Sequence, residues 1–182
     1  MELGKTLYVT NRKAWRSWLA KHHGTEKEIW LVYCKKKSGK PRIPYNDAVE
    51  EALCYGWIDS TVKKIDEERT AQRFTPRREK SPLSEMNKER ARRLIRAGKM
   101  TAVGLAKISA GIREKFVFPA DIIAAIKKDN AAWKNFKKFP LAYRRIRVGF
   151  VNGARNRPAE FGKRLRYLIK MSARNRKFGM VK

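Results

Sequence analysis

The segment "WIDS", residues 57–60, places an indole and a carboxylate two positions apart, and "RFTPRR", residues 73–78, adds three guanidinium groups soon afterwards. Guanidinium groups bind phosphates and carboxylates through paired hydrogen bonds, and an indole face attracts cations. An aspartate within a strand needs a partner or water. We therefore predict a shallow anion-binding surface, unless these side chains form only a structural salt-bridge ladder. Its proposed members are Trp57, Asp59, Arg73, Thr75, Arg77, Arg78 and Asn87.

A second group of basic residues lies near the C-terminus, where "YRRIRVGF" and "GKRLRYLIK" mix cations with apolar residues at helical spacing. From Gly111 onward the chain has 20 basic and 4 acidic residues, a net charge of +16. A merely solvated helix face usually carries both signs, so this bias predicts a basic groove or a membrane-surface patch. The alternative is an amphipathic helix with a charged outer face. The nucleic-acid-binding candidates are Arg144, Arg145, Arg147, Arg155, Arg157, Lys163, Arg164 and Arg166.

Residue patterns typical of enzymes are weak. The two histidines, His22 and His23, are adjacent, and adjacent helical side chains point about 100° apart, which makes a poor joint metal site. The chain has no P-loop, no G-x-S-x-G and no Rossmann glycine pattern. Cys34 and Cys54 lie in apolar contexts and are expected to be reduced and buried, a disulfide between them being the less favoured alternative. We predict no catalytic residues, no metal and no cofactor.

The composition supports binding to anions. The 182 residues include 45 lysines and arginines against 17 acidic residues, a net charge of +28. This excess attracts nucleic acid, anionic lipid or acidic protein, and it argues against direct capture of cationic ligands. No apolar run approaches the roughly 20 residues of a membrane span. The N-terminus has no signal-peptide core, so we expect a cytoplasmic protein without a transmembrane segment.

The periodicity of apolar residues, together with capping and turn residues, predicts the helices and strands of the first half of the chain. A helix should run from its cap at Asn11 to residue 23, and 29–34 is apolar on both faces, as in a central strand. A second helix should follow, capped by Asn46 or Asp47 and ending at Gly56 in a left-handed conformation. Residues 57–65 and 69–77 alternate around "DEE" and predict a β-hairpin.

The loop of this hairpin sets a predicted register. If residues 66–68 form the loop, Asp59 faces Thr75 and Trp57 faces Arg77. Asp59 would then lie diagonal to Arg73 and Arg77, within reach of their long side chains. Ile58, Val62 and Phe74 would share the opposite, buried face.

Beyond the hairpin the pattern is helical, with a cap candidate at Ser84, a helix stop at Gly98 and a helix opened by Pro119. The predicted fold is α+β: a small antiparallel sheet, made of one strand and the hairpin, packed with helices and followed by a helical C-terminal part. We expect an α+β domain over 1–110 and a basic helical region over 111–182, packed on the first.

Several short motifs of the chain are similar to those of a known family. They are "EALCYGWIDS", "RFTPRR", Ser81, Ser84, Asn87 and "GKM" with Gly104. Together they resemble the YdeI/OmpD-associated family, also described as bacteriocin-protection proteins. "FVNGARNRPAEFGKRLRYLIK" is similar to that family's closing helical segment. The resemblance covers most of the chain from Trp30 to Ile169. It implies an α+β bacterial protein linked to resistance against cationic antimicrobial peptides, with a possible porin partner and a periplasmic location, and it provides no catalytic residues.

The charge of this chain modifies that expectation. A protein of net charge +28 does not bind cationic peptides through charge, and the missing signal peptide favours the cytoplasm. We therefore predict a non-enzymatic member that acts by binding an anionic partner. The alternative is a sequence-nonspecific nucleic-acid-binding protein that uses the basic C-terminal helices.

Overall fold

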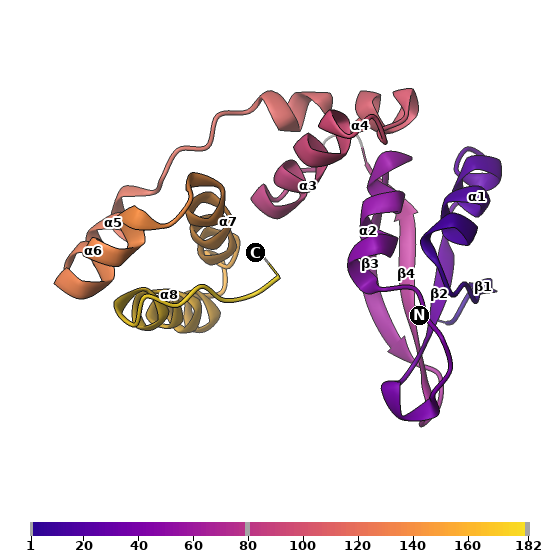
Figure 1. Ribbon diagram of the computed structural model, residues 1–182, viewed down its shortest axis with the longest axis horizontal. Coiled ribbons are helices and arrows are strands. Elements are labelled where there is room, and N and C mark those ends of the chain that lie inside the picture. Colours follow the sequence, from indigo (N-terminus) through magenta and orange to yellow (C-terminus); the bar gives the residue numbers. More distant parts are fainter. Residues whose placement is uncertain (1, 79–80, 181–182) are drawn as a thin grey trace. The chain divides into compact units, whose positions relative to one another are not determined.

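The computed structural model describes residues 2–78 and 81–180 and divides the chain into two compact units (Figure 1). The first unit comprises residues up to Leu83 together with Arg90–Arg113. The second comprises Ser84–Glu89 and the chain from Glu114 onward.

The first unit contains a four-stranded sheet in the order β1-β2-β4-β3, made of β1 (Thr6–Leu7), β2 (Ile29–Cys34), β3 (Trp57–Lys64) and β4 (Arg69–Pro76). β2 pairs antiparallel with β4 and parallel with β1. The predicted α+β class and the central position of β2 are confirmed. The sheet is mixed, however, and not purely antiparallel, because the two-residue strand β1 is too short to produce a periodic signal.

Two helices, α1 (Arg12–His22) and α2 (Tyr45–Cys54), cover one face of this sheet (Figure 1). A 3₁₀ turn, η1 (Lys36–Ser38), follows β2. The side chains that fill the space between helices and sheet are large and apolar, so their removal from water is the main stabilising term of this unit. They include Trp15, Leu19, Ile29, Leu31, Ala48, Val49, Ala52, Trp57 and Phe74.

The ends of these helices were partly predicted. The Asn11 side chain accepts a hydrogen bond from the Ala14 N–H at 2.9 Å, as expected of a cap, and Gly56 has the predicted positive φ, +72°. The predicted cap of α2 is wrong: Pro44 takes that position, while Asn46 and Asp47 lie inside the helix. Both side chains instead hydrogen-bond arginines of other elements.

The hairpin register is confirmed near the turn and wrong beyond it. Ile65 N–H bonds the Arg69 carbonyl at 3.0 Å, and Val62 faces Gln72 as predicted. Beyond a β-bulge at Ser60 and Thr61 the register shifts by one residue, so Asp59 faces Phe74 instead of Thr75. Such an extra residue moves every later side chain to the other face. The bulge is stabilised by Gln72, whose side-chain amide donates to the Ser60 carbonyl at 2.9 Å.

The shift changes which side chains of the hairpin are buried. Trp57 and Phe74 both enter the core, whereas Val62, predicted to be buried, is exposed. Trp57 faces Pro76 and not Arg77.

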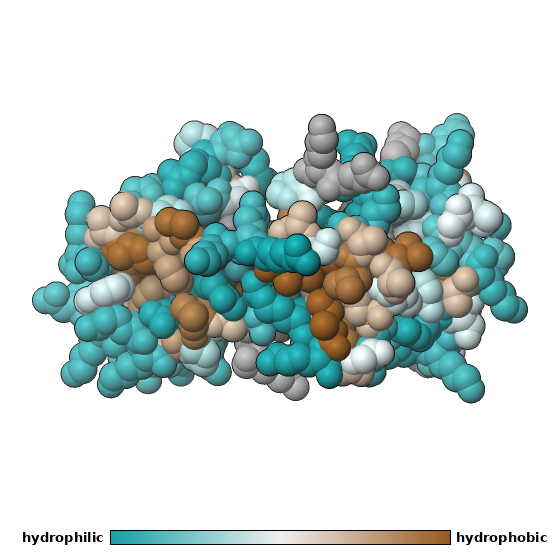
Figure 2. Space-filling view, turned by 90° about the horizontal axis from the view of Figure 1, so that it is seen from above, coloured by the Kyte–Doolittle hydropathy of each residue, from teal (hydrophilic) through white to brown (hydrophobic). Residues whose placement is uncertain are grey.

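Two further helices complete the first unit, α3 (Glu85–Arg96), whose first turn belongs to the second unit, and α4 (Ala102–Arg113). Gly98 ends α3 with a φ of +64°, and Ser84 Oγ accepts from the Asn87 N–H at 3.3 Å. α4 begins against the end of α2, where Thr101 bonds the Cys54 carbonyl through both its N–H and its hydroxyl. Figure 2 shows hydrophobic patches within a mostly hydrophilic surface. Val103 and Leu105 of α4 are exposed.

The second unit is helical, with α5 (Ala120–Lys127), α6 (Asn130–Lys138), α7 (Leu141–Asn152) and α8 (Pro158–Ala173). α8 lies against α6 and α7. The apolar sides of the four helices meet in one core that includes Ile122, Ile126, Phe136, Phe139, Tyr143, Val148, Val151 and Leu168.

Side-chain caps fix the ends of two helices in this unit. Asp129 begins α6 by accepting from the Ala132 N–H at 2.9 Å. The Asn135 amide donates to the carbonyls of Ser172 and Ala173 at the end of α8. In the described part of the chain, none of the helices has the length and apolar character needed to cross a bilayer.

Candidate functional site

The two residues at the centre of the predicted hairpin site have internal partners. Trp57 is only 1% exposed, and its indole N–H donates to the His23 carbonyl at 3.1 Å. The Asp59 carboxylate accepts a hydrogen bond from the Tyr45 hydroxyl at 2.7 Å. Burial, and then this hydrogen bond, raises the pKa of Tyr45 to about 12. The polar contact of Asp59 is therefore with α2.

The arginines of the hairpin point elsewhere. Arg73 pairs with Glu28, its Nε lying 2.7 Å from Oε2, and this bond lowers the pKa of Glu28. Arg77 is buried and donates to the Ser81 carbonyl at 3.0 Å. Within the described residues the Asp59 carboxylate forms no ion pair, so the predicted pairing of Asp59 with Arg73 and Arg77 is wrong.

The remaining members of this predicted group are dispersed. Thr75 faces Ile58, and Arg78 is exposed. Asn87 lies in the second unit. Asp59, Arg73 and Arg77 thus do not form one cluster, because the bulge rotates Asp59 toward α2 while the two arginines bind acceptors of their own.

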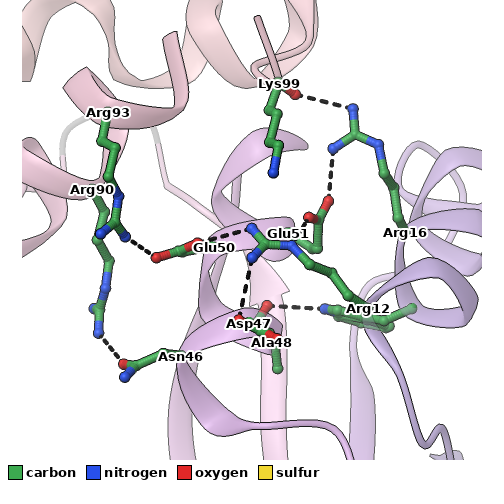
Figure 3. A network of polar contacts seen from close by, with 11 residues as sticks. Arg12, Arg16, Asn46, Asp47, Ala48, Glu50, Glu51, Arg90, Arg93 and Lys99 are labelled. Carbon is green, nitrogen blue, oxygen red and sulfur yellow. Dashed lines mark hydrogen bonds and ion pairs between the residues drawn. The ribbon is translucent and has the colours of Figure 1, made fainter. Parts of the chain in front are cut away.

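A larger ionic cluster surrounds α2, and Figure 3 shows it from close by. Glu51, only 2% exposed, accepts from Arg12 and from Arg16, the latter at 2.6 Å. Glu50 accepts from Arg12 at 2.8 Å and from Arg93. Because each buried carboxylate is matched by guanidinium groups, the cluster is a structural network that joins α1, α2 and α3.

The sequence contains a signal for this network. Arg12 and Arg16 are four residues apart, and so are Asp47 and Glu51, which places each pair on one face of its helix. Two helices with such complementary stripes are expected to pair.

In the C-terminal helices, four of the eight predicted nucleic-acid-binding residues are engaged internally. Arg145 pairs with Glu89 at 3.3 Å, Arg155 with both oxygens of Asp121 at 3.0 and 3.1 Å, and Arg164 with Glu160 at 2.7 Å. Arg147 is buried against aromatic rings. These four side chains are not free to bind a polyanion without breaking internal contacts. They are Arg145, Arg147, Arg155 and Arg164.

The other four predicted nucleic-acid-binding residues differ in their exposure to solvent. Arg144 is half-buried, and its Nε has no hydrogen-bond partner within the described residues. Arg157, Lys163 and Arg166 are exposed. Lys163 and Arg166 begin a row of cations along α8 that continues at intervals of four residues and defines the basic face of α8. Its members are Lys163, Arg166, Lys170 and Arg174.

The stretch from Lys163 to Arg174 contains no acidic residue. Glu160, the one acid of α8, precedes it, pairs with Arg164 and also interacts with Lys163. Tyr167 lies within the face and is 48% exposed. Its ring meets that of Phe178 edge-on at 4.8 Å. Lys170 and Arg174 were missed in the sequence, although their spacing from Lys163 and Arg166 was the signal that could have identified them.

The opposite side of α8 is buried within the second unit. Leu168 and Ser172 are buried, and Phe161, Leu165 and Ile169 pack against the core. The helix is therefore amphipathic with its apolar side already covered, and the charged side is the part open to a partner.

Comparison with known protein families gives two matches that follow one another along the chain. The family model described as a domain of unknown function (DUF8412) matches residues 7–107, more than half of the chain. The chain belongs to the DUF8412 family. Residues 115–175 match a second model, described as bacteriocin-protection, YdeI or OmpD-associated. No curated protein and no solved structure matches the chain.

These matches confirm the resemblance to the YdeI/OmpD-associated family over residues 115–175. The segment "EALCYGWIDS", residues 51–60, lies in the DUF8412 part. The basic face of α8 lies in the YdeI/OmpD-associated part.

Proposed function

We propose that this protein acts by binding, without catalysis, and that its partner is an anionic macromolecule held on the basic face of α8. The observation that carries the proposal is the row of four exposed cations without an acid among them. At 1.5 Å per residue, the row from Lys163 to Arg174 is about 16 Å long. A nucleic-acid strand places about five phosphates along that distance.

Among anionic partners, nucleic acid fits the face best. An amphipathic helix that binds a bilayer inserts its apolar side, and the apolar side of α8 is buried in the core of its own unit. Tyr167, exposed between the cations, offers a ring on which an unpaired base can stack. These features favour single-stranded nucleic acid, bound mainly through its phosphates and with little sequence preference.

The chemistry of the Cys54 thiol supports a binding role. Burial raises the pKa of the Cys54 thiol, so this side chain stays protonated at neutral pH, whereas the thiolate is the reactive form. The match over residues 115–175 supports a link to bacteriocin protection, as in that family's description. A porin partner and a cytoplasmic location stay predictions.

The test is a salt titration of binding, followed by fluorescence anisotropy of a labelled 20-nucleotide single strand. We expect the affinity to fall steeply as salt rises from 50 to 200 mM. Changing all four cations of the face to glutamine should lower the slope of log K against log salt by about 3, from about 0.7 for each phosphate contact. The variant carries K163Q, R166Q, K170Q and R174Q.

A matched control removes the same four charges from exposed positions of the first unit, with K13Q, K21Q, K36Q and K37Q. This control should keep nearly all of the wild-type affinity. Equal losses in the two variants would show that only the net charge matters and would overturn the placement on α8. Tighter binding to anionic vesicles than to the single strand would favour a lipid partner over nucleic acid.

A further inference from the structure

A cavity of about 320 Å³ lies inside the second unit, and it is independent of the basic face of α8. Its wall comes from the first turn of α3, from α7 and from the C-terminal segment that follows α8. Nearly all of this wall is apolar. The lining side chains that matter for its chemistry are Met86, Ile146, Arg147, Phe150 and Met180. The volume is within the range of small-molecule sites in proteins.

Arg147 is the exceptional residue of this wall. It is only 6% exposed, yet within the described residues no carboxylate or carbonyl accepts a hydrogen bond from its guanidinium. The group lies over the rings of Phe178 and Tyr143, 4.8 and 5.5 Å from their centroids. Burial lowers the pKa of the guanidinium, although it stays charged at neutral pH. Buried charges are normally paired, so this one is prepared for a counter-ion.

The end of the Arg147 guanidinium faces Gly179, a part of the cavity wall that has no side chain. A Cβ added at Gly179 would lie 2.5 Å from Nη1 and 2.8 Å from Nη2, so the end of the guanidinium lies directly against the Gly179 backbone. Gly179 also has a φ of +76°, a conformation that favours glycine. A guanidinium carries N–H donors side by side in one plane, the arrangement that binds the two oxygens of a carboxylate.

The other charges around the cavity limit the ligand to one negative charge. Glu85 lines the cavity, but its carboxylate is engaged by Lys88 at 2.9 Å and by Arg145 at 3.9 Å. Among the described residues of the wall, Arg147 is thus the one charge without an ionic partner. A monoanion neutralises it, whereas a phosphate dianion would leave an excess negative charge beside Glu85 in an apolar environment.

We infer that this cavity binds a small monocarboxylate with an apolar body, its carboxylate on the Arg147 guanidinium and its apolar part against Met86, Ile146 and Phe150. The ion pair supplies the specificity and the apolar wall supplies the burial. This function differs from the binding of a polyanion and does not depend on it.

The test uses octanoate as probe and octanamide, its uncharged counterpart, as control ligand. On wild-type protein we expect octanoate to raise the melting temperature and to shift the Arg147 Nε–H cross-peak in a proton–nitrogen NMR spectrum. Octanamide should bind at least about tenfold more weakly, because it loses the charge-assisted bonds. Equal binding of the two ligands, or no binding of either, overturns the proposal, and this comparison needs no variant.

Two variants locate the site. Arg147→Met keeps the length and apolar body of the side chain, so it should fold, lose the NMR cross-peak and bind octanoate no better than octanamide. Arg157→Met removes the same charge from an exposed position and should keep octanoate binding. The four-glutamine variant of the α8 face should also keep it, which separates this site from the polyanion surface. Octanoate binding that survives in Arg147→Met would place the carboxylate elsewhere and refute the assignment.

Discussion

Gly104 is the position where a single methyl group should have the largest effect on the first unit. This residue lies in the first turn of α4, directly against the end of α2. A Cβ added there would lie 2.5 Å from the carbonyl carbon of Cys54 and closer still to its oxygen. Backbone atoms cannot rotate away from such a contact, so Gly104→Ala must push the two helices apart.

The magnitude follows from two opposing terms. An ordinary Gly→Ala change inside a helix gains about 0.5–1 kcal/mol. Here the helices must separate by about 1 Å to restore a normal contact distance, which adds an overpacking cost of about 1–3 kcal/mol. The separation also weakens the two hydrogen bonds from Thr101 to the Cys54 carbonyl, each contributing about 1 kcal/mol. We expect a net loss of about 2–3 kcal/mol in the free energy of unfolding.

Urea denaturation followed by tryptophan fluorescence measures this loss, because four of the five tryptophans lie in the first unit. The midpoint should fall with little change in the slope m, since the surface exposed on unfolding is unchanged. Gly162→Ala is the matched control within α8. Its added Cβ would meet the flexible end of Arg166, at 3.2 Å, so this variant should gain up to about 1 kcal/mol, measured by far-ultraviolet circular dichroism. A gain of stability in Gly104→Ala as well would refute the close approach of α4 and α2.

Three further predictions concern buried or paired groups of the first unit. Glu51→Gln should lower the free energy of unfolding by about 2–3 kcal/mol, as measured by urea denaturation. This loss is smaller than the full cost of breaking a buried ion pair, because the arginines that bind Glu51 are about one-third exposed. An unchanged free energy of unfolding would contradict a stabilising network. Because Arg73 lowers the pKa of Glu28, their bond stabilises the fold above pH 4.5 and weakens as the pH falls below that value. Glu28→Gln should therefore flatten the acid limb of a plot of stability against pH. An unchanged acid limb would contradict the pairing. Native Cys54 should resist alkylation by iodoacetamide until the protein is unfolded, because its thiol is buried. Mass spectrometry of the treated protein measures the alkylation. Rapid labelling in native buffer would contradict the burial of Cys54.

Local patterns predicted most of the elements because their causes are local. The cap at Asn11, the left-handed Gly56 and the alternation around residues 66–68 each depend on residues within a few positions. The α+β class and the burial of β2 on both faces followed from the same patterns. The two-residue strand β1 carries no such pattern, since its pairing with β2 is what makes it a strand.

The bulge in the hairpin shows why the candidate site was harder to predict than the fold. Loop length determines the register only as far as Val62. Beyond it, the extra residue depends on Gln72, whose amide bonds the Ser60 carbonyl across the two strands. Alternation alone contains no information about that bond, and one additional residue was enough to direct Asp59 toward Tyr45 instead of toward the arginines.

The net charge of +28 therefore overstates the surface available to an anion, because arginines occupy three different environments in this chain. Some surround buried carboxylates, as Arg12 does at Glu51, and contribute to folding. Others, such as Arg147, lie on aromatic rings away from water. The third group, represented by Arg166 and Arg174 on the basic face of α8, presents its charge to solvent. Composition cannot separate these groups, since they differ in burial and in partners, and affinity for a polyanion should follow the third group alone.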